Sequence, residues 1–199
     1  QERYDLGYFK LDGFQASCET DKHPWHLPGD FAREANVEAV HRFFAALKNT
    51  DHPVHLNPTC GMWLSPWWLR VAESLWADTY DGESPSAAPA PNFREASTTS
   101  RDAQFRSRCR RNPWFPPYAL NTLDIYQPAS NLHYNDVMAT LARGQRLVQL
   151  HAHLRRFSKA DWRFLAHGFK WVRHNAATLS RTEQIPGDPL KGEPYGFAH

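Results

Sequence analysis

Strand-like and helical segments alternate along all 199 residues of this chain, and that alternation restricts the folds open to it. Five apolar segments have strand character, and we predict strands at 6–11, 54–57, 74–77, 118–125 and 147–154. Helical patterns lie between and after these strands, at 37–47, 65–72, 101–111, 136–142 and 162–179. Such an order predicts an α/β chain with a parallel sheet.

The ends of the predicted helices carry recognisable signals. Asp30 or Asn36 is placed to cap the first long helix, and Ser158 is placed to cap the last one. Gly144 ends the short helix before it. The tail at 186–199 is rich in Gly and Pro and is predicted to consist of turns.

The first predicted strand runs directly into Asp12, and Gly13 follows. We interpret this as a buried strand that presents Asp12 at its C-terminal edge, where barrels of parallel strands carry their chemistry. Lys10 lies on the same face, because side chains alternate along a strand, and it is placed to keep Asp12 ionised or to contact a substrate hydroxyl. An Asp-Gly turn explains the same residues without chemistry, so Asp12 needs a catalytic partner.

A second strand also delivers a carboxylate at its end. The segment 74–77 runs into Asp78, and Asp81 follows in the same loop. Two carboxylates on the rim of one barrel, about 5–5.5 Å apart, are the minimum for retaining glycoside hydrolysis. Trp76 would supply an apolar wall that keeps the acid protonated. One of Asp78 and Asp81 is interpreted as a turn residue.

The loop between these two strands is rich in aromatic residues, with three Trp between positions 63 and 68. Trp63 is placed to stack on the face of a sugar, and Asn57 or Cys60 would line the pocket. Packing within the protein is the alternative role for such a Trp. The whole chain holds eight Trp, seven Tyr and twelve Phe, a surplus that suits a site for flat apolar ligand faces.

Charge and hydropathy exclude several classes of partner. The formal net charge is +2, which is typical neither of a nucleic-acid-binding chain nor of a disordered one. No apolar run is long enough to span a membrane. The basic helix is interpreted as a solvated face rather than a polyanion site, and its arginines are Arg106, Arg108, Arg110 and Arg111.

The eleven histidines raise the question of a metal site. His151 and His153 fall on one face of a predicted strand, but no third ligand accompanies them at a characteristic spacing. The remaining histidines of the first third are scattered along the chain: His23, His26, His41, His52 and His55. The three cysteines have neither disulfide-framework nor zinc-knuckle spacing. We therefore predict no metal and no cofactor.

The segment Tyr8-Phe9-Lys10-Leu11-Asp12 resembles the Lys-x-Asp nucleophile strand of the melibiase-like retaining α-galactosidases, the glycoside hydrolase clan of families 27 and 36. Further segments look like a bacterial branch of the same clan, in the same order along the chain, at 63–69, 74–76, 101–102, 111–116, 187–189 and 192–196. The resemblance covers nearly the whole chain.

This resemblance implies a (β/α)8 catalytic barrel in which the fourth strand carries the nucleophile and the sixth the acid/base. Asp12 then matches the nucleophile, Asp78 the acid/base, and Asp81 is the reserve. Lys10, with Cys60 or Trp63, would contact the sugar. Residues 1–199 would form the C-terminal part of one such domain, about strands 4 to 8, so any export signal would precede Gln1 and localisation stays open.

The implied function is double-displacement hydrolysis of a terminal α-linked galactose, or a related α-glycoside, in an oligosaccharide or glycoside substrate. The alternative is a catalytically inactive carbohydrate-binding remnant or fragment of such an enzyme. A third hypothesis is a metal-dependent hydrolase built on His151 and His153. The sequence does not specify the sugar, the linkage or the oligomeric state.

Overall fold

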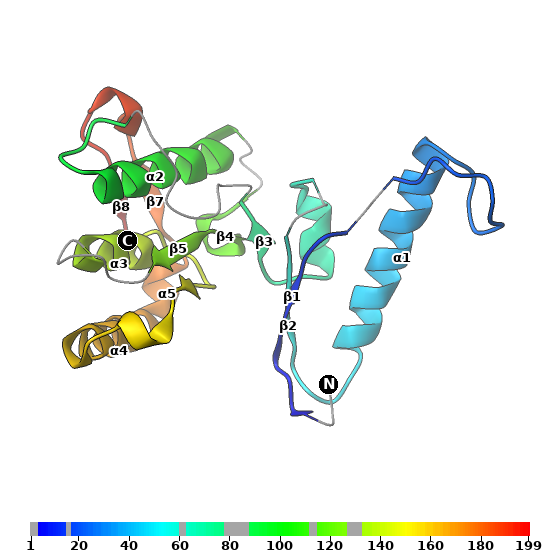
Figure 1. The fold of residues 1–199 in the computed structure, drawn as a ribbon, viewed down its shortest axis with the longest axis horizontal. Helices are drawn as coiled ribbons and strands as arrows, with labels where there is room; N and C mark the ends of the chain where they lie inside the picture. Colours follow the sequence, from blue (N-terminus) through cyan, green and yellow to red (C-terminus); the bar gives the residue numbers. More distant parts are fainter. Residues whose placement is uncertain (1–3, 15–16, 60–62, 78–87, 112–114, 127–132) are drawn as a thin grey trace. The chain divides into compact units, whose positions relative to one another are not determined.

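The computed structural model describes residues 4–14, 17–59, 63–77, 88–111, 115–126 and 133–199. For some of these the description covers the backbone alone, namely residues 110, 111, 123, 124, 126 and 133. The chain divides into two compact units, Gln1–Asp78 and Thr79–His199 (Figure 1).

Unit 1 contains two paired parallel strands and the long helix that connects one to the next along the chain (Figure 1). The strands are β1, Tyr8–Leu11, and β2, His55–Pro58, and the helix is α1, Asp30–Lys48. Parallel strands cannot be joined by a tight turn, and α1 supplies the required crossover. The pairing register sets Lys10 opposite Asn57. Both strands lie where the sequence predicted them.

The N-terminus of α1 differs from the prediction. The helix begins at Asp30, its N-cap residue is Gly29 with φ 72°, and no side chain caps it. Asp30 instead sits in the first turn, where a carboxylate favours the positive end of the helix dipole, and it accepts a 2.6 Å hydrogen bond from Arg33. Asn36 lies inside the helix. Neither predicted cap is therefore correct.

The segment after β2 forms a short 3-10 helix and then a third strand. The helix η2 is Pro66–Arg70, with Pro66 at its first position as predicted. The Ser65 hydroxyl caps it by accepting from the Trp67 N–H at 3.4 Å. The strand β3 is Leu75–Trp76, and it lies beside β2.

The Glu73 side chain connects strand β2 to the C-terminal end of helix α1. Its carboxylate accepts a 2.8 Å hydrogen bond from the Leu56 N–H of β2 and forms an ion pair with Lys48 at the end of α1. Its own N–H donates to the Leu56 carbonyl at 3.2 Å. A single side chain thus fixes the end of the helix and the edge of the strand at once.

Unit 2 contains a second parallel pair with a helical crossover. The strands are β5, Leu123–Tyr126, and β6, Gln149–His151, and the helix between them is α3, His133–Ala142. The long basic helix is α2, Phe93–Arg111, which begins earlier than predicted. The remaining elements are η3 Pro117–Ala119, β4 Leu120–Asn121, η4 Leu154–Arg156, α4 Lys159–His174, α5 Ala176–Leu179, β7 Glu183–Ile185, η5 Pro189–Lys191 and β8 Gly196–Ala198.

The core of unit 2 lies where α3 and α4 meet β5. It consists of five buried apolar side chains: Ile125, Val137, Leu141, Phe157 and Leu165. Ser158 caps α4, as predicted, and it also forms a full capping box with Asp161, which was not predicted. Gly144 follows the end of α3 with φ 77°, which confirms it as the residue that ends this helix.

The C-terminal tail contains more than turns. The strands β7 and β8 pair antiparallel, which the sequence did not predict. Arg106 of α2 is buried, and its guanidinium donates to the carbonyl oxygens of Ile185, Gly187 and Gly196 at 2.7–3.1 Å. A solvated role is therefore wrong for Arg106, which uses its charge to bind the backbone of this hairpin.

Within each unit, the sheets formed by described residues have two strands, and no closed barrel is present among them. The (β/α)8 assignment stays a prediction. The expectation of a buried first strand is wrong for unit 1, because Tyr8 and Lys10 are exposed and alternate with half-buried neighbours. Among the helices of the described residues, none combines the length and apolarity needed to cross a membrane.

Candidate functional site

Asp12 follows β1 directly and is exposed. The backbone just before it is fixed, because the Leu11 carbonyl accepts hydrogen bonds from both the N–H and the hydroxyl of Thr59, at 2.8 and 3.2 Å. Gly13, directly after Asp12, has φ 74°, a backbone conformation that glycine adopts without strain. The carboxylate thus stands at the C-terminal edge of a parallel pair whose ends are held together.

Lys10 lies over the indole ring of Trp76. Its ammonium nitrogen is 5.8 Å from the ring centroid, within the range of a cation–π interaction. Trp76 of β3 is buried, whereas Lys10 is exposed. The structure therefore brings together two residues of the predicted substrate site, and the contact with the ring favours one direction of the lysine side chain.

Asn57 is held inside unit 1. Its side-chain nitrogen donates to the carbonyl and to the hydroxyl of Ser74, both at 3.1 Å, and its oxygen accepts from the Tyr8 hydroxyl at 3.5 Å. The residue is fully buried. Partial burial also raises the pKa of the Tyr8 phenol, which keeps it a hydrogen-bond donor. Asn57 thus links β1, β2 and the residue before β3.

Trp63 lies in a cleft between α1 and the segment that contains η2. The cleft has a volume of about 650 Å³, and its aromatic walls include Trp63, Trp67 and Trp68. Trp63 is 49% exposed, and its ring meets the Trp68 ring edge-on at 5.9 Å. The Trp68 indole N–H also donates to the Trp63 carbonyl at 3.1 Å. This arrangement leaves an indole face accessible in a concave surface.

His41 forms the opposite wall of the same cleft. Its ring stacks on Trp68 at 4.8 Å with an interplanar angle of 19°. Burial, and then the positive charge of Arg70, lower the pKa of His41. The imidazole is therefore neutral at pH 7, and the cleft presents aromatic faces flanked by arginine and glutamate side chains.

Three predicted site residues lie outside the described residues: Cys60, Asp78 and Asp81. The structure consequently gives no separation between Asp12 and either candidate acid. Of the predicted set, Lys10, Asn57 and Trp76 are neighbours, Asp12 lies two residues beyond Lys10, and Trp63 faces the cleft against α1.

Histidine and cysteine side chains gather at a place the sequence did not indicate. Cys18, His23 and His26 approach one another in the loop between β1 and α1. His153, in contrast, caps η4, because its ring accepts from the Arg155 N–H at 3.3 Å. The spacing C-x4-H-x2-H was the available signal, but it matches none of the common zinc patterns.

Comparison with known proteins gives no assignment. No protein-family model matches the chain, and no curated protein matches it.

Proposed function

We propose that this chain carries part of the active site of a retaining α-glycosidase of the melibiase-like type, with Asp12 as the nucleophile. The observation that supports the proposal is the exposed Asp12 at the C-terminal end of a parallel strand, two residues after a lysine that is oriented by an indole ring. Active sites of parallel α/β barrels occupy that edge. Asp78 is the proposed acid/base, and Asp81 is its alternative.

In the first step, an Asp12 carboxylate oxygen attacks the anomeric carbon, and the bond from that carbon to the leaving oxygen breaks. The acid/base donates its proton to the leaving oxygen as this bond breaks. In the second step it takes a proton from water, which attacks the same carbon and releases Asp12. Two inversions retain the α configuration. Lys10, two residues before Asp12 along β1, would contact a hydroxyl of the bound sugar.

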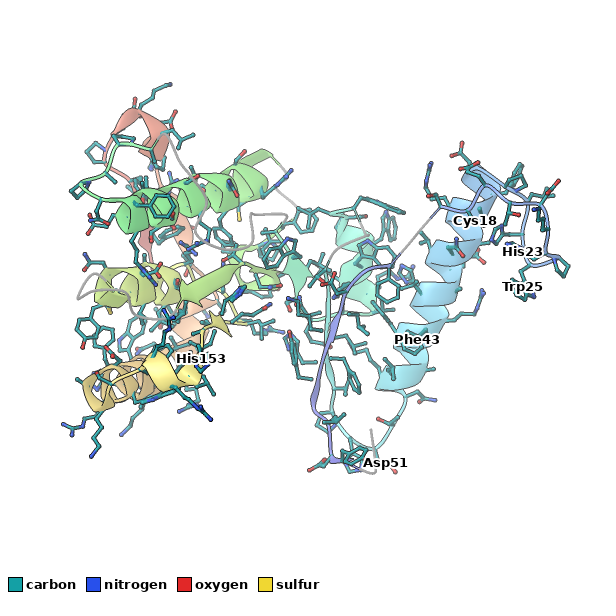
Figure 2. The ribbon with its side chains drawn as sticks, viewed as in Figure 1. Cys18, His23, Trp25, Phe43, Asp51 and His153 are labelled. Carbon is teal, nitrogen blue, oxygen red and sulfur yellow. The ribbon has the colours of Figure 1, made fainter. Side chains whose placement is uncertain are left out.

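The covalent intermediate provides the direct test. A slow α-galactoside with a fluorinated ring and an activated leaving group is expected to add one glycosyl mass to the chain. Peptide mapping by mass spectrometry should locate it on Asp12. Asp51 is a control in the same experiment, because it lies in the exposed turn before β2 (Figure 2). Modification at another residue, with Asp12 unmodified, would contradict the assignment.

Carbohydrate binding without hydrolysis is the second candidate, and the aromatic cleft favours it. Trp63 and Trp67 are 49% and 66% exposed in a concave surface, which is the arrangement that stacks on sugar rings. We expect Trp63→Ala to weaken binding of galactose or raffinose by at least about fivefold, or ~1 kcal/mol.

Titration calorimetry measures this effect in the full chain. Trp171→Ala is the matched control, because Trp171 is 40% exposed on α4. Binding by the unchanged chain in the absence of turnover would favour this second candidate over the glycosidase. Equal weakening by both substitutions would refute a role for Trp63, and absence of any binding would refute the second candidate.

A further inference from the structure

The loop between β1 and α1 brings three metal-ligating side chains together. One ligand atom each from Cys18, His23 and His26 lies within 4.8 Å of the other two. All three residues are half-buried. Within the described residues, no other group of three or more histidine, cysteine or acidic side chains meets the same criterion. Figure 2 labels Cys18 and His23 in this loop, beside the start of α1.

The separation of two of these groups fits a tetrahedral ion. Cys18 Sγ lies 3.5 Å from His23 Nε2. A zinc ion with a sulfur ligand at about 2.3 Å and a nitrogen ligand at about 2.1 Å sets the two ligand atoms roughly 3.6 Å apart at tetrahedral angles. The separation of the thiol sulfur and the imidazole nitrogen therefore suits two ligands of one tetrahedral zinc ion.

The hydrogen bonding of His26 also fits a role as a metal ligand. Its Nδ1 lies 2.9 Å from the Leu27 carbonyl oxygen, and because a carbonyl can only accept, this nitrogen carries the hydrogen. Nε2 then holds the lone pair. Metal-binding histidines commonly fix their tautomer through such a bond from the other ring nitrogen to a backbone carbonyl.

The ring of His23 presents Nε2 to Cys18, so Nε2 is its ligand nitrogen. The other ring nitrogen, Nδ1, is buried and has no hydrogen-bond partner among the described residues. Buried polar atoms of this kind are rare, and this one indicates a place for an ordered water that would accept its hydrogen. The ring itself is held by stacking on Trp25 at 4.9 Å and by edge-on contact with His26 at 4.5 Å.

We propose that Cys18, His23 and His26 bind one divalent zinc-class cation through a thiolate and two neutral imidazoles. Three protein ligands leave a fourth position for water or another ligand. Thiolate and imidazole favour zinc over magnesium or calcium, which prefer oxygen ligands. For this loop, the proposal departs from the prediction of no metal that was made from spacing alone.

The cation has a structural consequence for the loop. The Gly29 N–H donates to the Cys18 carbonyl at 3.3 Å, which joins the two ends of the segment that holds the three ligands. The bound ion would cross-link the same segment through the side chains of Cys18, His23 and His26. This site stands independently of the proposed glycosidase, because none of its ligands takes part in the hydrolytic steps.

Zinc and cobalt binding to the full chain test the proposal. We expect one Zn²⁺ per chain to survive desalting, and one Co²⁺ to give the visible spectrum of a tetrahedral site with a thiolate-to-cobalt charge-transfer band. Cys18→Ser and His26→Ala should each weaken Zn²⁺ binding at least about a hundredfold. Cys109→Ser, at a half-buried cysteine of α2, should leave it unchanged.

Alkylation is measured on the unchanged protein, so this test does not depend on whether a variant folds. Zn²⁺ should protect Cys18 from iodoacetamide, and a chelator should restore its reaction, as followed by peptide mapping. Cys109 is the internal control, because burial raises the pKa of its thiol to about 12 and its slow alkylation should proceed at the same rate with and without Zn²⁺. Absence of stoichiometric Zn²⁺, Zn²⁺ binding that Cys18→Ser does not change, or Cys18 alkylation that Zn²⁺ does not slow would each overturn the proposal.

Discussion

An Asp12→Ala variant is expected to lose hydrolysis of aryl α-galactosides by a factor on the order of 10⁴ to 10⁶, the range found when an enzyme loses a residue that forms or directly supports its covalent intermediate. Asp12 is exposed at the end of β1, and the backbone before it is held by Thr59. Removal of the carboxylate should therefore affect chemistry far more than stability. Steady-state kinetics and urea unfolding of the same variant measure the two effects.

Azide distinguishes a missing nucleophile from general damage. With an activated aryl α-galactoside, azide should enter the space left by Asp12→Ala, attack the anomeric carbon and displace the phenolate. A single inversion gives the β-galactosyl azide, whereas the unchanged enzyme gives α-galactose. Nuclear magnetic resonance identifies the anomer of each product.

A matched substitution controls for the loss of one negative charge. Asp51 is an exposed carboxylate in the same unit, and Asp51→Ala should keep the activity of the unchanged chain. Turnover by Asp12→Ala at the unchanged rate would exclude Asp12 as the nucleophile. If urea unfolding shows that Asp12→Ala does not fold, its lost activity says nothing about the nucleophile. The mass-spectrometric mapping of Asp12 in the unchanged protein then provides the test.

Local sequence signals predicted the local parts of the structure. The apolar residues before Asp12 predicted β1, Ser158 predicted the start of α4, and Gly144 predicted the end of α3. Each signal acts over a few residues, because caps and strand periodicity are properties of neighbouring backbone groups. The predicted cap of α1 was wrong, because the N-cap residue is Gly29, which has no side chain that could identify it as a cap.

Contacts between distant segments were not predictable in this way. Arg106 looked like one more solvated arginine of a basic helix, yet its partners are carbonyl oxygens near residues 185–196. Asn57 looked like a pocket residue, and its amide binds Ser74 inside the fold. Spacing along the chain contains no information on such partners, because the fold alone brings them together.

The buried ion pair of Asp102 and Arg143 is expected to produce the largest effect on stability. The Arg143 Nε donates to one Asp102 oxygen at 2.5 Å, and the Tyr195 hydroxyl donates to the other at 2.7 Å. Arg143 is fully buried. Asp102→Ala removes the carboxylate that this buried guanidinium binds, and we expect a loss of about 3–5 kcal/mol in the free energy of unfolding, measured with urea. That is a large part of a typical total of about 5–15 kcal/mol.

The comparison with an exposed pair and with a double variant identifies the cause. Lys191 and Asp188 form an ion pair at 3.4 Å on the surface, and Lys191→Ala should cost no more than about 1 kcal/mol. Replacing both buried partners, as in Asp102→Ala with Arg143→Met, should cost less than the sum of the two single changes, because no buried charge then lacks its partner. Additive losses, or a loss below about 1 kcal/mol for Asp102→Ala alone, would show that solvent reaches this pair and that its burial does not determine the stability of unit 2.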